Sequence, residues 1–379
     1  APYGPDGLET SFTQPDGTVI HLRVFGDEFY ARTETLDKHV VVFDTTKQAY
    51  FYAELNDLGA YEATDRLVGQ DLPPEYVDRS IKEEPELRKA KAWKMYDATA
   101  GEMRCSSRWE TIKSSHRQSL KSNQSTWGNI GNDGSAYSPP SHTTIGNYVG
   151  LTILVDFSDD VGTIAQSDVD NYCNQVGYNG NSNSGSVRDY FYDQSNGLLT
   201  YTNQVTAYVR VPQTKAYYND TTQSSGTRGR LLLEDALTEL INSAYDFSGL
   251  TADGSGHIYA CNILFAGANS GVWAKGLWPH RWVLSSPRSV GGGKYVYDYQ
   301  ITNLGTSLRI GTFCHENGHM LLGYSDYYDY GGESSGLSYH DLMSSGNYNN
   351  GARTPAGINC YLKWKSGWMT VTELSASDI

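Results

Sequence analysis

Apolar and polar residues alternate over residues 15–70 with the two-residue period of β-strands. The runs TVIHLRVFGDEFYARTE and KHVVVFDTTKQAYFYAEL are rich in β-branched and aromatic residues, and Gly-Asp and Thr-Thr-Lys turns interrupt them. Residues 72–98 then show a helical pattern that Pro85 divides. These patterns predict a small antiparallel β unit with a helical tail over residues 1–104.

Residues 119–144 show little periodicity and are rich in Ser, Asn, Gly and Pro. This composition is typical of an exposed linker and of a site of proteolytic nicking. We therefore expect a flexible linker and activation segment over residues 105–146.

Buried-strand and helical patterns mix over residues 147–379, where a second domain is predicted. VGLTILVDFSD and GHIYACNILFAG are typical of buried strands, and LWPHRWVL and KYVYDYQI predict edge strands. Helical patterns cover IAQSDVDNYCNQVGY, GSVRDYFYDQSNG and GRLLLEDALTELINSAYD. One sheet with several helices gives an α+β fold.

Charge and composition exclude several classes of protein. The 379 residues carry a net charge of -14, which argues against broad binding to nucleic acid or anionic membranes. No apolar run approaches the ~20 residues of a membrane span. The sequence starts with APYGPDG and has sequons at Asn123 and Asn219, as expected of a secreted, extracellular chain after removal of a signal peptide.

The five cysteines are an odd number, which in an oxidising compartment allows two disulfides and one remaining thiol. Their positions suggest pairing of Cys314 with Cys360 and of Cys173 with Cys261, which leaves Cys105. Sequence alone leaves the other connectivities open.

The segment CHENGHMLLGYSDYYD, residues 314–329, carries the chemistry. On a helix His315 and His319 share one face, so both imidazoles can bind one metal ion, and Glu316 lies about 100° around the axis. Zinc polarises a carbonyl and acidifies water, and a carboxylate can accept and return the proton during peptide-bond hydrolysis. The alternative is an ordinary exposed polar helix.

A catalytic zinc normally has a third protein ligand. Gly323 is a natural helix end, and Asp326 is the first carboxylate after it that can turn back. The alternatives for the third ligand are Asp329, Glu333, His340 and Asp341. Asp326 and Asp329 could instead form a weak calcium site.

Several motifs in order resemble the M6 family of secreted zinc metallopeptidases, the immune inhibitor A group. The motifs are LTILVDFSDD, GSVRDYFYDQSNGLLTYTNQV, ADGSGHIYACNILFAG, LWPHRWVL, HENGHMLLGYSDYYDYGG, YHDLMSSGNYNNG and TPAGINCYLKWKSGWM. The resemblance covers residues 147–379 and implies a zincin-type catalytic domain with a mixed sheet and an active-site helix. It also implies that the small β-rich front part is a prodomain.

The resemblance implies roles for particular residues. His315 and His319 would be zinc ligands, Glu316 the catalytic base and Met343 the Met-turn residue beneath the metal. One departure is that HMLLGYSD is one residue longer than the usual His-x-x-Gly-x-x-Asp, which affects the third ligand, Asp326.

A donor that stabilises the oxyanion would lie after the motif. Tyr348 is the first candidate for this donor, and Tyr339 and His340 are alternatives. Trp278 and His280 are expected to be core and edge-strand residues.

The resemblance further implies a latent proenzyme, with the chain's own propeptide as a partner and protein or peptide substrates. Cys105 lies in the connecting segment beside Arg104, and its thiolate could occupy the open zinc position as a latency switch. The alternative hypothesis is that the protein is not an enzyme but a secreted adhesin or carbohydrate-binding protein with a structural zinc. A structural zinc has no use for Glu316, which favours the peptidase.

Overall fold

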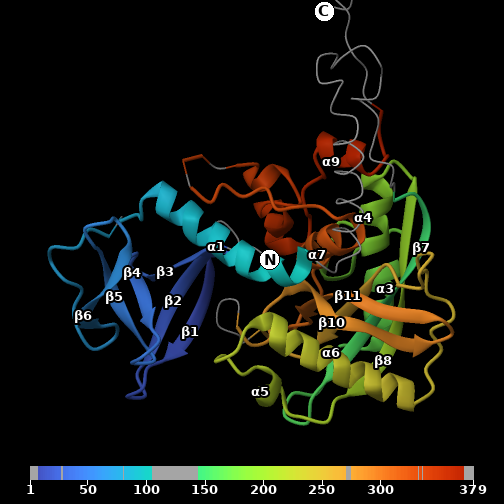
Figure 1. Ribbon diagram of the computed structural model, residues 1–379, viewed down its shortest axis with the longest axis horizontal. Helices are drawn as coiled ribbons and strands as arrows, with labels where there is room; N and C mark the ends of the chain where they lie inside the picture. The colour runs from blue at the N-terminus through green and yellow to red at the C-terminus, as the bar shows by residue number, and fades with distance from the viewer. Residues whose placement is uncertain are drawn as a thin grey trace, which may run out of the picture. The chain divides into compact units, whose positions relative to one another are not determined.

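The computed structural model describes residues 7–26, 29–79, 81–104, 144–269, 275–331, 333–334 and 336–370, with residues 96–104 described by their backbone alone (Figure 1). The chain forms two compact units. Unit 1 comprises Ala1–Ala100 and Tyr327–Ser338, and unit 2 comprises Gly101–Asp326 and Tyr339–Ile379. Among the helices of this described part, none is long and apolar enough to cross a membrane.

Unit 1 contains a six-stranded antiparallel sheet whose strands follow one another in chain order. The strands are β1 (Leu8–Thr13), β2 (Val19–Gly26), β3 (Ala31–Thr35), β4 (Val40–Asp44), β5 (Ala49–Leu55) and β6 (Tyr61–Leu67). Its core consists of Ile20, Leu22, Val41, Tyr50, Tyr52 and Val68. The predicted antiparallel β unit is confirmed for this region.

The helix of unit 1, α1 (Pro85–Arg104), begins at the proline that was expected to divide it. Proline suits the first helical position because its missing N–H has no partner to lose there. The described residues between 72 and 84 form no helix, so this half of the helical prediction is wrong. Pro73 and Pro74 disfavour a helix there, because neither can donate a backbone hydrogen bond.

Tyr327–Ser338 belongs to unit 1 although the sequence analysis assigns it to the second domain. Arg88 of α1 donates a hydrogen bond to the carbonyl of Gly331, and the neighbouring Lys89 forms an ion pair with Glu333. The rings of Phe29 and Tyr330 meet edge to face with centroids 6.3 Å apart. Unit 1 is therefore built from two separate stretches of the chain.

Unit 2 is organised around a five-stranded mixed sheet of order β10-β11-β9-β7-β8. Its strands are β7 (Gly146–Asp156), β8 (Leu199–Arg210), β9 (Cys261–Phe265), β10 (His280–Gly291) and β11 (Lys294–Asn303). The neighbours are parallel except for the antiparallel pair β10 and β11. The predicted α+β class with a mixed sheet is confirmed. β10 is an edge strand as predicted, whereas β11 lies inside the sheet.

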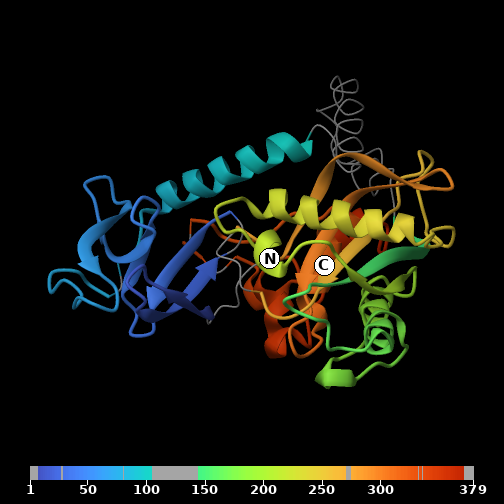
Figure 2. The same cartoon turned by 90° about the horizontal axis from the view of Figure 1, so that it is seen from below.

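The helices of unit 2 include those that the apolar spacing predicts (Figure 2). They are α3 (Gln166–Asn174), α4 (Val187–Gln194), α5 (Lys215–Tyr218), α6 (Ser225–Asn242), α7 (Ile310–Leu322), α8 (Asn349–Ala352) and α9 (Cys360–Lys365), with short 3-10 turns η3 (Gly180–Ser182), η4 (Ser338–His340) and η5 (Ser345–Tyr348). Ser186 caps α4 by accepting a hydrogen bond from the Asp189 N–H, as capping boxes do.

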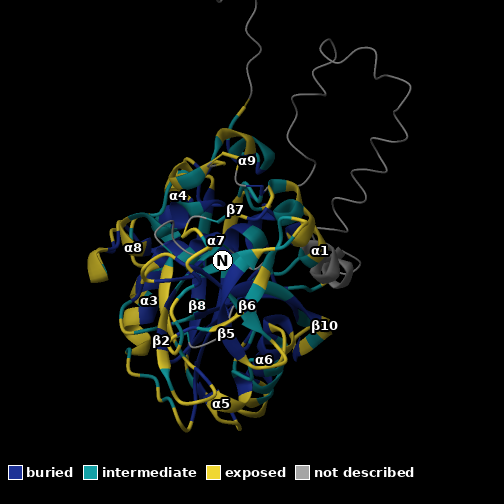
Figure 3. Ribbon diagram, turned by 90° about the vertical axis from the view of Figure 1, so that its left-hand side faces the viewer, coloured by how far each residue is buried: buried dark blue, intermediate teal, exposed yellow. Residues whose placement is uncertain are grey.

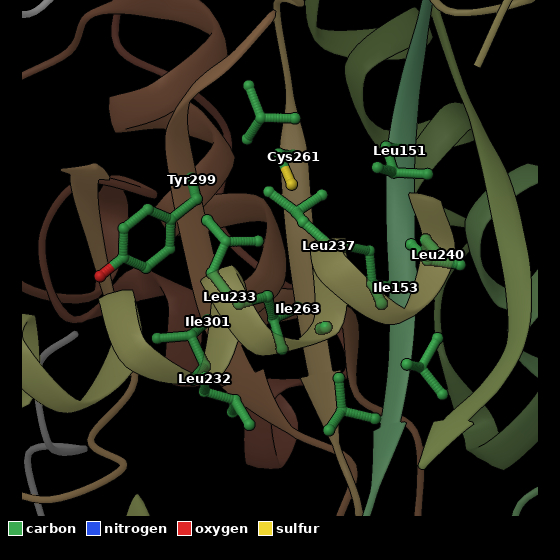
Figure 4. Packing of buried hydrophobic residues seen from close by; sticks show 14 of the residues in the cluster. Leu151, Ile153, Leu232, Leu233, Leu237, Leu240, Cys261, Ile263, Tyr299 and Ile301 are labelled. Carbon is green, nitrogen blue, oxygen red and sulfur yellow. The ribbon is translucent and has the colours of Figure 1, made fainter. Parts of the chain in front are cut away.

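The two faces of the unit 2 sheet differ in chemistry. Odd-numbered residues of β7, β9 and β11 pack against the leucines of α6, as Figure 4 shows for Ile153, Ile263 and Leu237. Successive strand residues point to opposite faces, so even-numbered residues such as Asn262 face away from α6. The strands carry many fully buried residues (Figure 3), as expected of parallel strands covered on both sides.

The α6 core makes a first prediction. Leu237 is fully buried, so Leu237→Ala should lower the free energy of unfolding by about 2–5 kcal/mol through lost contacts and a residual cavity. Ile241 on the same helix is 37% exposed, and Ile241→Ala should cost less than about 1 kcal/mol. Urea denaturation of both variants measures the difference. Equal losses would contradict this description of the core.

Candidate metal centre

Helix α7 carries the His-Glu-x-x-His segment and ends in a wide turn. Gly323 follows the helix with φ 66°, in the left-handed region that favours glycine. The Tyr324 N–H donates to the carbonyl of Gly318, six residues earlier, at 3.0 Å. After this turn the chain leads back towards the histidines, where Asp326 lies.

Three of the predicted residues meet at one point. The Nε2 atoms of His315 and His319 lie 3.2 Å apart, and each lies 3.3 Å from Oδ1 of Asp326. Within the described ranges, this is the one group of three or more His, Cys, Asp or Glu side chains close enough to hold a metal ion. The donor set of two imidazoles and one carboxylate matches a three-ligand catalytic zinc site.

The two imidazoles are oriented from behind by backbone carbonyls. Nδ1 of His315 lies 2.8 Å from the Leu342 carbonyl, and Nδ1 of His319 lies 2.8 Å from the Tyr324 carbonyl. A ring nitrogen bonded to a carbonyl must carry the proton, so the lone pair is left on Nε2. Outer hydrogen bonds of this kind are typical of metal-ligating histidines. The residues present therefore fit a metal ion.

Charge supports the same description. Burial alone would raise the pKa of Asp326, but the imidazoles of His319 and His315 lower it far below its usual range. Asp326 is thus a carboxylate at neutral pH, the form that binds a metal.

Asp341, an alternative third ligand, has a different place. It is buried and accepts hydrogen bonds from the Met343 N–H at 2.8 Å and the Asn359 N–H at 2.7 Å. It thereby fixes the turn that presents the Leu342 carbonyl to His315. The sequence analysis missed this supporting role. Asp341 stands alone between His340 and the apolar residues Leu342 and Met343, and nothing in that local pattern indicates which groups it binds.

The remaining alternatives do not join the histidines. Glu333 and His340 are exposed, and Asp329 accepts a hydrogen bond from the hydroxyl of Ser334. The suggested calcium site at Asp326 and Asp329 finds no support, because Asp326 lies with the two histidines.

Met343 and Gly318 are in close contact. Met343 is fully buried, and a Cβ added to Gly318 would lie 2.5 Å from its sulfur. Glycine at this position lets the methionine approach the backbone of α7 between the two histidines. The Met-turn role of Met343 stays a prediction.

Glu316 lies on α7, and Tyr348 lies on η5. Glu316 is fully buried within α7, which contradicts an ordinary exposed polar helix. Tyr348 lies in η5, which packs against α7. Burial raises the pKa of Tyr348, the Glu316 carboxylate raises it further, and a hydrogen bond with Thr312 lowers it. Tyr348 therefore keeps its proton at neutral pH and can donate it in a hydrogen bond. The alternatives Tyr339 and His340 are exposed.

Trp278 and His280 are core residues, as predicted. They are 4% and 3% exposed, and His280 is the first residue of β10. Burial lowers the pKa of His280 to about 4, so its ring is neutral at pH 7.

The suggested disulfides are absent from the described part of the chain. Cys173, Cys261 and Cys314 are free and buried, and Cys360 is free and exposed. Cys261 packs in the α6 core, whereas Cys173 bonds to Thr152 on the opposite face of the sheet, so these two thiols cannot meet. Cys105 lies outside the described residues.

The contact between α7 and η5 makes a second prediction. Ala normally stabilises a helix by about 1 kcal/mol relative to Gly, but a Cβ at Gly311 would lie 1.9 Å from the carbonyl oxygen of Asn347. The backbone must shift, so Gly311→Ala should lower the free energy of unfolding by about 1–3 kcal/mol. Gly254, with no atom within 4 Å of such a Cβ, supplies the control variant Gly254→Ala. A stabilised Gly311→Ala in thermal unfolding would refute the contact.

Residues 265–370 match the family model of the immune inhibitor A peptidase M6 catalytic domain. This stretch contains the histidine pair, Glu316, Asp326 and Met343. Comparison with curated proteins gives no match. The matched segment confirms the resemblance for the motifs that it contains, and it supports a peptidase with protein or peptide substrates. Over residues 265–370, the chain is similar to the M6 peptidase catalytic domain.

Proposed function

We propose that the chain is a zinc-dependent endopeptidase, secreted and present as a latent proenzyme. The observation that carries the proposal is the meeting of His315, His319 and Asp326 beside the buried Glu316. All four lie inside the segment that matches the M6 catalytic domain, a family that is generally zinc-dependent.

Each residue has a proposed task. His315 and His319 would hold zinc through Nε2, and Asp326 through its carboxylate. The bound zinc would supply a Lewis acid that polarises the peptide carbonyl and acidifies water. Glu316 would accept the proton from the attacking water and return it to the leaving amine. The Tyr348 hydroxyl would donate a hydrogen bond to the developing oxyanion.

Latency is proposed to depend on the N-terminal part. Residues 1–104 would act as the propeptide, and a cut within residues 105–146 would activate the enzyme. Cys105, in the connecting segment, is proposed to occupy the open metal position before that cut, since a thiolate is a strong zinc ligand.

The test uses the full-length chain. Elemental analysis should find about one zinc per chain, and hydrolysis of an unfolded protein such as casein should follow limited proteolysis of residues 105–146. A chelator should abolish that hydrolysis, and added zinc should restore it. A chain that neither contains nor takes up zinc would refute the proposal. Zinc without hydrolysis, before and after cutting, would indicate a binding protein instead.

X-ray absorption on the uncut chain tests the latency step separately. One sulfur neighbour of zinc supports the Cys105 switch, and its loss in Cys105→Ala would assign it. A zinc with nitrogen and oxygen neighbours alone overturns the switch and leaves the peptidase intact.

A further inference from the structure

A row of buried polar side chains crosses the face of the unit 2 sheet that is turned away from α6. Gln300, Asn262 and Thr152 are direct partners in the strand register of β11, β9 and β7. All three are fully buried. A buried sheet face between helices is normally apolar, so this polar row requires an explanation.

The row joins two residues of β8 and one of α7 into one hydrogen-bonded set, here called the amide network. Its members are Thr152, Tyr201, Asn203, Asn262, Gln300 and Asn317. The Asn262 amide is the hub: its oxygen accepts from Gln300 and Asn317, both at 3.0 Å. The network therefore connects α7 to four strands.

Asn317 is the residue directly after Glu316. Its Nδ2 donates to Asn262 Oδ1 at 3.0 Å and to the Phe313 carbonyl at 2.9 Å, and its Oδ1 accepts from the Tyr201 hydroxyl at 2.9 Å. The side chain is fully buried. Its amide is thus held at both ends.

Helix geometry explains how the hydrogen bonds of Asn317 affect the histidine pair. Asn317 is about 200° around the axis from His315, so it anchors the side of α7 opposite the histidine pair. Side-chain tips lie about 5–6 Å from the axis, so a rotation of about 20° would move the ligand atoms by about 2 Å. Catalytic geometry tolerates much less than that. Apolar packing is non-directional, whereas amide hydrogen bonds fix direction.

The network is also costly. Nδ2 of Asn203 and Oε1 of Gln300 are buried with no hydrogen-bond partner among the described residues. An unsatisfied buried polar group destabilises a fold, and apolar side chains of similar size would avoid that cost. Stability alone does not explain the network.

We infer that Asn317 and Asn262 are positioning residues, which set the rotation of α7 so that His315, His319 and Glu316 address one metal ion. The inference rests on the proposed function and deepens it. Both residues act through α7 and contact neither metal nor substrate.

The test compares two buried substitutions in the full-length chain. Asn317→Leu removes the link between α7 and the sheet. Thr206→Val, also buried, removes a hydrogen bond from the Leu154 N–H within the sheet and leaves the network intact. The melting temperature of each variant is measured first. Zinc affinity, against a competing chelator, and kcat, after a cut within residues 105–146, are then measured well below that temperature.

Both variants should have a lower melting temperature than the parent chain. Asn317→Leu should also bind zinc about 10–100-fold more weakly, as loss of outer-shell support does, with kcat at least tenfold lower and KM little changed. Thr206→Val should keep zinc affinity and kcat within about twofold. A folded Asn317→Leu with the zinc affinity and kcat of the parent would overturn the inference.

Two further results separate the possible failures. If Asn317→Leu does not fold, Tyr201→Phe deletes one hydroxyl of the network; a weakened zinc affinity supports the inference, and an unchanged one overturns it. If the parent chain binds zinc but hydrolyses nothing even after a cut within residues 105–146, the proposed peptidase fails while zinc affinity still decides the inference. A parent that binds no zinc overturns both.

Discussion

Glu316→Gln is expected to lower kcat by about 10²–10⁴-fold while the fold and the zinc content stay unchanged. Glutamine keeps the size of glutamate but cannot accept a proton, and general-base catalysis contributes about this much to rate. Glu316 is fully buried beside the histidine pair, and it is the one carboxylate of α7. Single-turnover hydrolysis of a fluorogenic peptide, with zinc measured on the same sample, gives the result.

The matched control for this substitution is Glu239→Gln on α6. Glu239 is exposed, and its substitution should leave kcat unchanged. Full activity of Glu316→Gln would remove the proposed base. Loss of both activity and zinc would show that Glu316 supports the site and not the proton transfer.

Asp326→Ala is expected to have the second large effect, which is a loss of zinc affinity. Removal of a residue that only hydrogen-bonds to a metal ligand costs about 10–100-fold in affinity, and removal of the ligand Asp326 should cost more. Asp326 contributes a carboxylate oxygen that lies 3.3 Å from each of the two Nε2 atoms. Without it, the two imidazoles would hold the metal alone. Competition with a chelator of known affinity measures the change.

Asp329→Ala is the matched comparison, because Asp329 was an alternative third ligand three residues further along the chain. Its carboxylate accepts hydrogen bonds within its own turn, so zinc affinity should stay within about twofold. Equal zinc affinity in Asp326→Ala and the parent would exclude Asp326 as a ligand. A larger loss in Asp329→Ala would assign the ligand to that residue.

The positions of the candidate metal ligands on the helix could be predicted from the sequence, because helix spacing and helix ends depend on neighbouring residues only. His315 and His319 share a helix face by spacing alone, and Gly323 marks the helix end by its conformational freedom. The antiparallel strands of residues 15–70 also followed from short-range patterns, whereas the mixed sheet followed from the family resemblance.

What depended on distant partners was missed. In the sequence, Asn262 is a single polar residue within an otherwise apolar strand, and the sequence gives it no role. Its role follows from the folded structure, where it accepts a hydrogen bond from Asn317 of α7. The suggested disulfides are not seen in the described part of the chain. For Cys173 and Cys261 the reason is that spacing along the chain does not say on which side of the sheet a cysteine lies. The helix was expected on both sides of Pro85 because periodicity continued through it, whereas proline begins a helix more readily than it interrupts one.

The division of unit 1 between two stretches affects what a protease can release. Tyr327–Ser338 is joined at both ends to unit 2 and is counted with the N-terminal stretch. Under the proposed activation, a single cut within residues 105–146 would leave a nicked, two-fragment complex. The N-terminal fragment would then have to dissociate against contacts such as Arg88 with Gly331 and Lys89 with Glu333. Its departure would be a reversible equilibrium that depends on dilution and on salt.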